Sequence, residues 1–182
     1  MESSETAFLT GKSIFLRKLV LKDANFNYLK WMHDVNITSG IYTGIYPTSL
    51  KELKNYIRSA AQNKNELAFA ICWKRSRVHI GNIKIESFDM ISRTCGLGII
   101  IGEKKYWGRG VGEEACSMMI DYAFERLNFR KITLIVFSNN PAAFRLYSKL
   151  GFKKEGVLKR HIFRNGRYED KIFMSLFNPR FQ

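Results

Sequence analysis

Cysteine is scarce in this 182-residue sequence, which contains only three. Their odd number, their wide spacing and the lack of a Cys-x-x-Cys pair argue against a disulfide framework and against a zinc site. Each cysteine lies among apolar residues, which favours a buried thiol over a catalytic one. We therefore expect a protein of a reducing compartment, without a metal, whose unpaired thiols are Cys72, Cys95 and Cys116.

Long apolar runs are missing as well. No stretch approaches the roughly 20 apolar residues that a membrane-spanning helix needs. Residues 1–6 are polar and partly acidic, whereas a secretory signal begins with basic residues and continues into an apolar segment. These absences predict a cytoplasmic protein with no membrane partner.

Proline and glycine, with 3 and 13 residues, are too few for a collagen-like or low-complexity chain. Hydrophobic residues make up 46% of the sequence and charged residues 25%, which are the values of a globular domain. The length suits one domain. We expect a short tail over residues 1–12 and a single domain over residues 13–178.

Acidic residues are outnumbered, with 16 Asp and Glu against 30 Lys and Arg, for a formal net charge of +14. Such a balance favours anionic partners, whether nucleic acid, a membrane surface or a phosphate-bearing ligand. A basic surface that is simply solvated, with no dedicated partner, is an equally good interpretation of this charge. Because the sequence lacks the patterns of an RNA-recognition motif or a zinc finger, a nucleic-acid-binding module is an alternative that charge alone supports.

The spacing of apolar residues predicts alternating strands and helices. Helices are expected from about Asp23 as N-cap, from the capping box at Ser49 and Glu52 to about residue 63, over 116–127, and over 141–151. Strands are expected over 13–20, 67–73, around 83–85, and over 97–101, 132–137, 157–163 and 169–177, the last two joined at Asn165-Gly166. The order predicts an α/β (α+β) fold, a mixed sheet with helices on both faces.

A glycine-rich turn is the most informative stretch. The apolar strand at 97–101, expected to be covered on both faces, leads to Gly108, Gly110 and Gly112, which open a helix. Glycines let a ligand approach the backbone, and the first turn of a helix offers unpaired N–H groups to an anion, best a phosphate. The spacing fits neither a P-loop nor a dinucleotide fingerprint. The alternative interpretation is that the glycines only form a tight strand-to-helix connection that binds no ligand.

The stretch Tyr106-Trp-Gly-Arg-Gly-Val-Gly112 resembles the cofactor motif Gln/Arg-x-x-Gly-x-Gly/Ala of the GNAT superfamily of acetyl-CoA-dependent N-acetyltransferases, with Trp107 at the first position. The later segment 140–152 is similar to the Asn-x-x-Ala-x-x-x-Tyr-x-x-x-Gly-Phe of the branch that holds ribosomal-protein alanine acetyltransferases and spermidine acetyltransferase. The resemblance covers about residues 13–177. It implies a single-domain GNAT-like fold with a mostly antiparallel seven-stranded sheet.

The resemblance also implies a binding mode for acetyl-CoA as co-substrate. The strand at 99–101 splays from its neighbour and pairs with the pantetheine arm, and the amides of 108–112 hold the pyrophosphate. Asn140 contacts the pantetheine or caps the helix before Pro141. The implied cofactor residues are Ile99, Ile100, Ile101, Trp107, Gly108, Arg109, Gly110, Val111, Gly112, Glu113, Asn140, Ala143 and Tyr147.

Tyr147 stands at the family's tyrosine position, where the resemblance implies a general acid for the leaving CoA thiolate. A neutral primary amine is expected to attack the thioester directly, without a covalent enzyme intermediate. The base is left open between Glu86 and Glu103, with Asp89 and His33 as further candidates by location. His79 and His161 are expected to be surface or sheet residues.

The acceptor amine stays undetermined: a small molecule, an amino sugar or a protein N-terminus all fit, and a homodimer is possible. Segment 33–46 and the turn at 88–93 are expected to shape the acceptor pocket, because loops carry specificity. An acetyl-CoA sensor or scaffold without catalysis is the alternative on the same fold, and retention of Tyr147 weighs against it.

Overall fold

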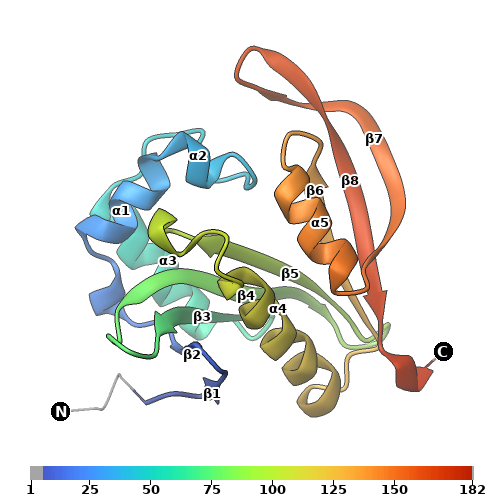
Figure 1. The fold of residues 1–182 in the computed structure, drawn as a ribbon, viewed down its shortest axis with the longest axis horizontal. Helices are drawn as coiled ribbons and strands as arrows, with labels where there is room; N and C mark the ends of the chain where they lie inside the picture. Colours follow the sequence, from blue (N-terminus) through green and yellow to red (C-terminus); the bar gives the residue numbers. More distant parts are fainter. Residues whose placement is uncertain (1–5, 182) are drawn as a thin grey trace.

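The computed structural model describes residues 6–181, which form one mixed sheet with helices on both faces (Figure 1). Residues 1–5 of the expected N-terminal tail lie outside the described part. The strands are β1 (Leu9–Thr10), β2 (Ile14–Lys18), β3 (Glu66–Trp73), β4 (His79–Asp89), β5 (Thr94–Ile101), β6 (Lys131–Phe137), β7 (Lys153–Arg164) and β8 (Arg167–Phe177). The helices are α1 (Phe26–His33), α2 (Val35–Thr38), α3 (Leu50–Gln62), α4 (Val111–Asp121) and α5 (Pro141–Lys149).

The sheet order is β1-β2-β3-β4-β5-β6-β8-β7, and every neighbouring pair is antiparallel except β5–β6. The predicted fold class is confirmed, with one difference in the strand count. The sheet has eight strands instead of seven, because Leu9 and Thr10 pair with Leu16 and Phe15 of β2. A two-residue strand is too short to produce an alternating pattern that a sequence reading can detect.

Two apolar cores lie on opposite faces of the sheet. The larger one packs α4 and α5 against the strands, and β5 contributes Cys95, Leu97 and Ile99 to it. The smaller one packs α1 and α3 against the other face, where Ile100 lies. The three cysteines are buried and unpaired, as expected. No helix within residues 6–181 is both long and apolar enough to span a bilayer.

The pairing of β5 with β6 ends early. It covers only Thr94, Cys95 and Gly96 of β5, which pair with Lys131, Ile132 and Thr133 of β6. Beyond these pairs β5 continues to Ile101 and β6 to Phe137, and the two strands diverge (Figure 1). We call this divergence the splay. Because of it, Ile99 to Ile101 are only half-buried, and the expectation of a strand covered on both faces is wrong at this end.

The first long helix begins later than expected. Its N-cap is Asn25, whose side chain accepts from the amides of Asn27 and Tyr28 at 3.0 and 3.2 Å, so the assignment of Asp23 as N-cap is wrong. Asp23 instead accepts two hydrogen bonds from the buried Arg17 guanidinium, at 2.7 and 2.8 Å. Burial would raise the pKa of Asp23, but hydrogen bonds from Arg17 and from the Val20 amide bring it below its ordinary value.

Candidate active site

The glycine turn lies where β5 ends and α4 begins. Gly108 and Gly110 have φ angles of +70° and +76°, in the left-handed region that favours glycine. A methyl group built at either position would meet no atom within 4 Å among the described residues. Gly110 is the N-cap of α4 and contributes no side-chain cap, so the first amides of the helix are free to bind an anion.

The side chains around this turn fall into two groups. Arg109 is exposed and has no partner among the described residues, so its charge is available to a ligand. Trp107 is fixed by a hydrogen bond from its indole N–H to the Ile101 carbonyl, at 2.9 Å. Val111 is buried in the core, and Glu113 is engaged in an ion pair with Lys149 at 2.7 Å. Arg109 is therefore the free side-chain cation at the turn.

Helix α5 lies on the other side of the splay. Asn140 is its N-cap, with the side chain accepting from the Ala143 amide at 3.1 Å, and Pro141 occupies the first turn, as the sequence predicted. Gly151 follows the helix with φ +93°. The capping role leaves the amide nitrogen of Asn140 facing residue 40, because a methyl group built at Gly40 would lie 2.6 Å from it.

Tyr147 is buried between α5 and α4, and its ring contacts that of Phe152 at a centroid distance of 5.7 Å. Burial, and then the neighbouring Cys116, raise the pKa of Tyr147 well above its ordinary value. Its hydroxyl has no hydrogen-bond partner among residues 6–181. The phenol is therefore protonated at neutral pH and able to donate.

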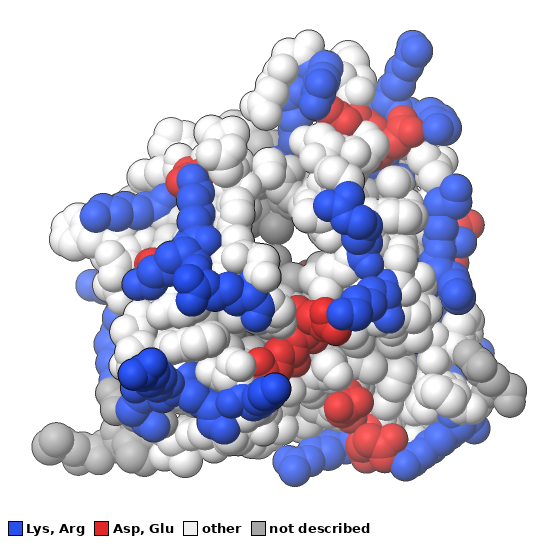
Figure 2. Space-filling view, viewed as in Figure 1, with Lys and Arg blue, Asp and Glu red and all other residues white. Residues whose placement is uncertain are grey.

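A hollow lies between the part of the molecule that carries α1 and α2 and the part that carries α5 (Figure 2). It coincides with the splay in the matching view of Figure 1. The glycine turn, the half-buried end of β5 and α5 surround the same opening.

Residues 13–153 match the family model described as an acetyltransferase (GNAT) domain. The chain belongs to this family. The uncharacterised N-acetyltransferase YoaA of Bacillus subtilis is 32% identical over 120 residues, which cover 65% of this chain and 67% of that protein. Spermidine N(1)-acetyltransferase of Escherichia coli is 35% identical over 101 residues, which cover 56% of this chain and 54% of that protein.

The crystal structure of spermidine N-acetyltransferase from Vibrio cholerae in complex with CoA and spermine has the same fold, with a TM-score of 0.84 and 29% identity. The match covers 93% of this chain and 98% of that one. The chain described here is thus a GNAT N-acetyltransferase.

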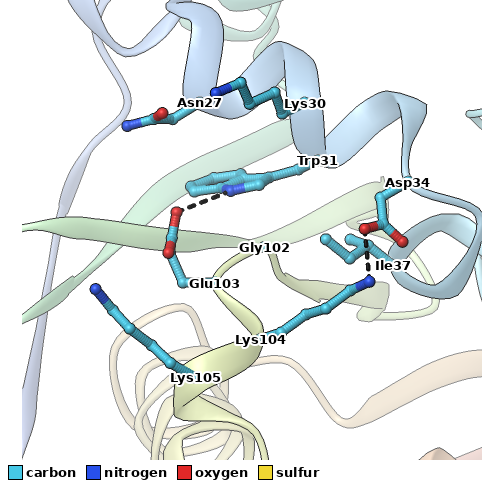
Figure 3. Close-up of a pocket in the computed structure, with 9 residues that line it drawn as sticks. All are labelled: Asn27, Lys30, Trp31, Asp34, Ile37, Gly102, Glu103, Lys104 and Lys105. Atoms are coloured by element: carbon cyan, nitrogen blue, oxygen red, sulfur yellow. Dashed lines mark hydrogen bonds and ion pairs between the residues drawn. The ribbon is translucent and has the colours of Figure 1, made fainter.

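The candidate base Glu103 of this acetyltransferase lies in a pocket of about 290 Å³ beside α1 (Figure 3). Its carboxylate accepts a hydrogen bond from the Trp31 indole N–H at 3.2 Å. Lys104 pairs with Asp34 across the same pocket, at 2.6 Å. Glu103 therefore points toward α1, and its Oε1 atom already accepts the hydrogen bond from Trp31.

The candidate base Glu86 lies on β4, opposite Gly96 of β5. Gly96 is the last β5 residue that pairs with β6. A methyl group built at Gly98 would lie 3.8 Å from the Glu86 Oε1 atom. The Glu86 side chain is 38% exposed, and Lys84 pairs with it at 2.5 Å. Of the two glutamates, Glu86 lies beside the splay.

The other two candidates are engaged elsewhere. His33 contacts the main chain of Thr48, with its Nε2 atom 2.8 Å from the Thr48 carbonyl. Asp89 accepts from the amides of Ile91 and Ser92 and so closes the β4–β5 turn, at the paired end of β5 and β6. The turn at 88–93 therefore lies at the closed end of the splay. Within residues 6–181, no three His, Cys, Asp or Glu side chains group as metal ligands.

Segment 38–46, which we call the strap, contacts the α5 side of the molecule. The Arg164 guanidinium donates to the carbonyls of Thr38, Ser39 and Ile41. The Tyr42 ring meets the Phe137 ring edge-on, at 5.2 Å between centroids. Sequence reasoning placed this segment near the acceptor but missed Arg164, because nothing local marks a contact between residues so far apart in sequence.

Proposed function

We propose that this enzyme transfers the acetyl group of acetyl-CoA to a primary amine by direct attack, without a covalent enzyme intermediate. One arrangement carries the proposal: an open glycine turn, the free end of β5 and a protonated buried tyrosine surround one splay. The unpaired buried thiols support a reducing, cytoplasmic setting for the reaction.

The cofactor contacts follow from this arrangement. Along the β5 end at Ile99 to Ile101, the backbone groups of Ile99 and the amide of Ile101 face the splay and bind the pantetheine arm as an added strand would, whereas Ile100 pairs with β4 and the Ile101 carbonyl accepts from Trp107. The amides of residues 108–112 bind the pyrophosphate, and the unpartnered Arg109 adds a cation beside it. Asn140 and Ala143 line the opposite side from the start of α5, and Trp107 supports the turn through its bond to β5. Glu113 borders the site through its backbone, since its carboxylate pairs with Lys149.

Proton transfers complete the proposal. Acetyl-CoA supplies an activated thioester carbonyl. Glu86 accepts the proton of the incoming ammonium, directly or through a water, because it borders the splay and Glu103 is held at α1. Tyr147 donates its phenolic proton to the sulfur as the C–S bond breaks, so that free CoA leaves as a thiol. The nitrogen, which carries a positive charge after its attack, loses its second proton through solvent to the Tyr147 phenolate, and the product is a neutral amide.

The acceptor is an amine on a small molecule, an amino sugar or a protein N-terminus. The related enzymes named above include spermidine acetyltransferases, which act on a small amine. The net charge of +14 supports binding of the anionic cofactor and provides no separate reason to propose nucleic acid as a substrate.

A screen of acceptor amines with detection of released CoA thiol tests the proposal. Amine-dependent CoA release with a matching acetylated product is expected. Tight binding of acetyl-CoA without release for any amine class would instead identify a sensor. No binding of acetyl-CoA at all would overturn the cofactor assignment.

A further inference from the structure

Lys84 and Glu86 face away from the helix that binds the cofactor. They alternate on β4 with Ile83 and Ile85, which are fully buried in the core on the α4 side. Side chains of a strand alternate between faces, so the two charged residues lie on the α3 side. The glycine turn opens α4 and belongs to the other face. An acceptor that meets the cofactor at the splay therefore approaches from the side of Lys84 and Glu86.

The two β5 residues opposite this pair have no side chains. Lys84 pairs in register with Gly98 and Glu86 with Gly96. A methyl group built at Gly98 would lie 3.5 Å from the Lys84 Cε atom and 3.8 Å from the Glu86 Oε1 atom. The charged side chains thus cover the glycine positions at the point where β5 separates from β6.

The ammonium group of Lys84 itself occupies this position. The Lys84 Nζ atom lies 2.5 Å from the Glu86 Oε2 atom and 3.9 Å from the Glu66 Oε1 atom. Glu66 also accepts a hydrogen bond from the Tyr56 hydroxyl at 3.2 Å. About a third of the Lys84 side chain is exposed, so an incoming molecule can reach it. The two carboxylates beside this position, Glu86 and Glu66, are therefore already paired within the protein.

We propose that Lys84 determines acceptor specificity by excluding a second cation, so that the enzyme acts on acceptors with one amine and no other positive charge nearby. The inference rests on the proposed function and narrows its substrate class. A second ammonium beside Lys84 meets a like charge, and it finds Glu86 and Glu66 already partly neutralised. An acceptor whose distal group is a hydroxyl meets neither obstacle.

Two matched acceptors test the inference: 5-amino-1-pentanol and 1,5-diaminopentane. They share chain length and reacting amine, and differ only in the distal group. For the wild type we expect kcat/KM at least about 10-fold higher for the amino alcohol, after correction for the two equivalent amines of the diamine. Lys84→Met keeps most of the aliphatic stem and should abolish or reverse this preference.

Lys54→Met is the matched control, because Lys54 is exposed on α3 and its loss changes the net charge equally. The ratio of the two kcat/KM values is the readout, since Lys84→Met also alters the surroundings of Glu86. Lys84→Gln is a second variant that removes the charge but keeps a polar side chain. Melting curves of both Lys84 variants verify that the fold is retained.

Equal kcat/KM values in the wild type, or an unchanged ratio in both Lys84 variants, would overturn the inference while leaving the acetyltransferase assignment intact. Acetylated Lys84 in the wild type, found by mass spectrometry, would overturn it too, because the lysine would then be a substrate. Failure of every amine would instead refute the proposed function.

Discussion

The Arg164 guanidinium donates a hydrogen bond to the carbonyl of Thr38 at 3.0 Å, across 126 residues of sequence. Arg164 also lies over the Phe137 ring, 4.9 Å from its centroid. The end of β7 is thereby bound to the strap. Together with the ring contact between Tyr42 and Phe137, this side chain connects the two halves of the molecule on the far side of the splay from the paired strand ends.

Loss of Arg164 is expected to release the strap. Hydrogen bonds from a charged donor contribute about 1.5–3 kcal/mol. In Arg164→Met we therefore expect KM for the acceptor amine to rise about 10-fold or more, with a smaller change in kcat and in acetyl-CoA affinity. Steady-state kinetics with both substrates varied measures this. Arg167→Met, an exposed arginine in the same hairpin, is the control and should leave KM unchanged.

A side chain at Gly112 is expected to block the phosphate site without harming the fold. Gly112 has no left-handed φ, and a methyl group there would meet only Leu146, at an ordinary 3.5 Å. Gly112→Val should lower acetyl-CoA affinity at least about 10-fold by calorimetry, with the melting temperature preserved. Gly156→Val on β7, also a glycine with open space around it, should leave affinity unaltered. Unchanged affinity in Gly112→Val would remove the turn from the cofactor site.

Removal of the Tyr147 hydroxyl is expected to slow the chemical step. Tyr147→Phe keeps the ring and its contact with Phe152, and the hydroxyl makes no hydrogen bond within the described chain. We expect kcat to fall about 10²- to 10⁴-fold, with the melting temperature and acetyl-CoA affinity nearly unchanged. Tyr168→Phe, on an exposed part of β8, serves as the control. A wild-type kcat would leave Tyr147 as a packing residue only.

Acid is expected to destabilise the fold through Asp23 and His79. Burial lowers the pKa of His79 from its ordinary 6.5, so the unfolded chain binds this proton more readily and stability falls as the pH drops below about 6.5. The pKa of Asp23 is below its ordinary 3.8, so its contribution is present above that pH and is lost as the pH falls through the folded-state value.

Asp23→Asn tests the second of these contributions. It should cost about 3–5 kcal/mol at pH 7, because it leaves the Arg17 charge buried without its partner, and should flatten the loss of stability below pH 4. Denaturant unfolding at a series of pH values measures both effects. Asp170→Asn, at a partly exposed carboxylate whose partner Lys159 is exposed, should change stability much less. An equal loss of stability in the two variants would refute a special role for Asp23.

Features determined by local chemistry could be predicted from the sequence. The capping box at Ser49 and Glu52 is formed, and Asn165 and Gly166 both have positive φ in the hairpin that they were expected to make. The glycine turn opens a helix as predicted. Each of these follows from a few neighbouring residues.

Features determined by distant contacts could not be predicted. Asp23 has the side chain of an N-cap, but Arg17 on the neighbouring strand binds it instead. The apolar run at the end of β5 resembles a fully covered strand, and only the departure of β6 leaves it half-buried. The proposal of Glu86 over Glu103 as the base depends on the position of Trp31, which lies 72 residues before Glu103 in the chain.

Only three residue pairs join β5 to β6, and apart from the two-residue strand β1 no neighbouring strands in the described sheet share fewer. The sheet thus consists of two antiparallel parts, β1–β5 and β6–β8, joined by these three pairs and connected at the other end by Arg164 and by the contact between Tyr42 and Phe137. A substrate that lies along the unpaired edge of β5 would form the backbone hydrogen bonds that β6 does not provide. On the proposed binding mode, amide exchange at Ile99 and Ile101 should slow when acetyl-CoA binds, because the co-substrate would then pair with the edge of β5 that faces the splay.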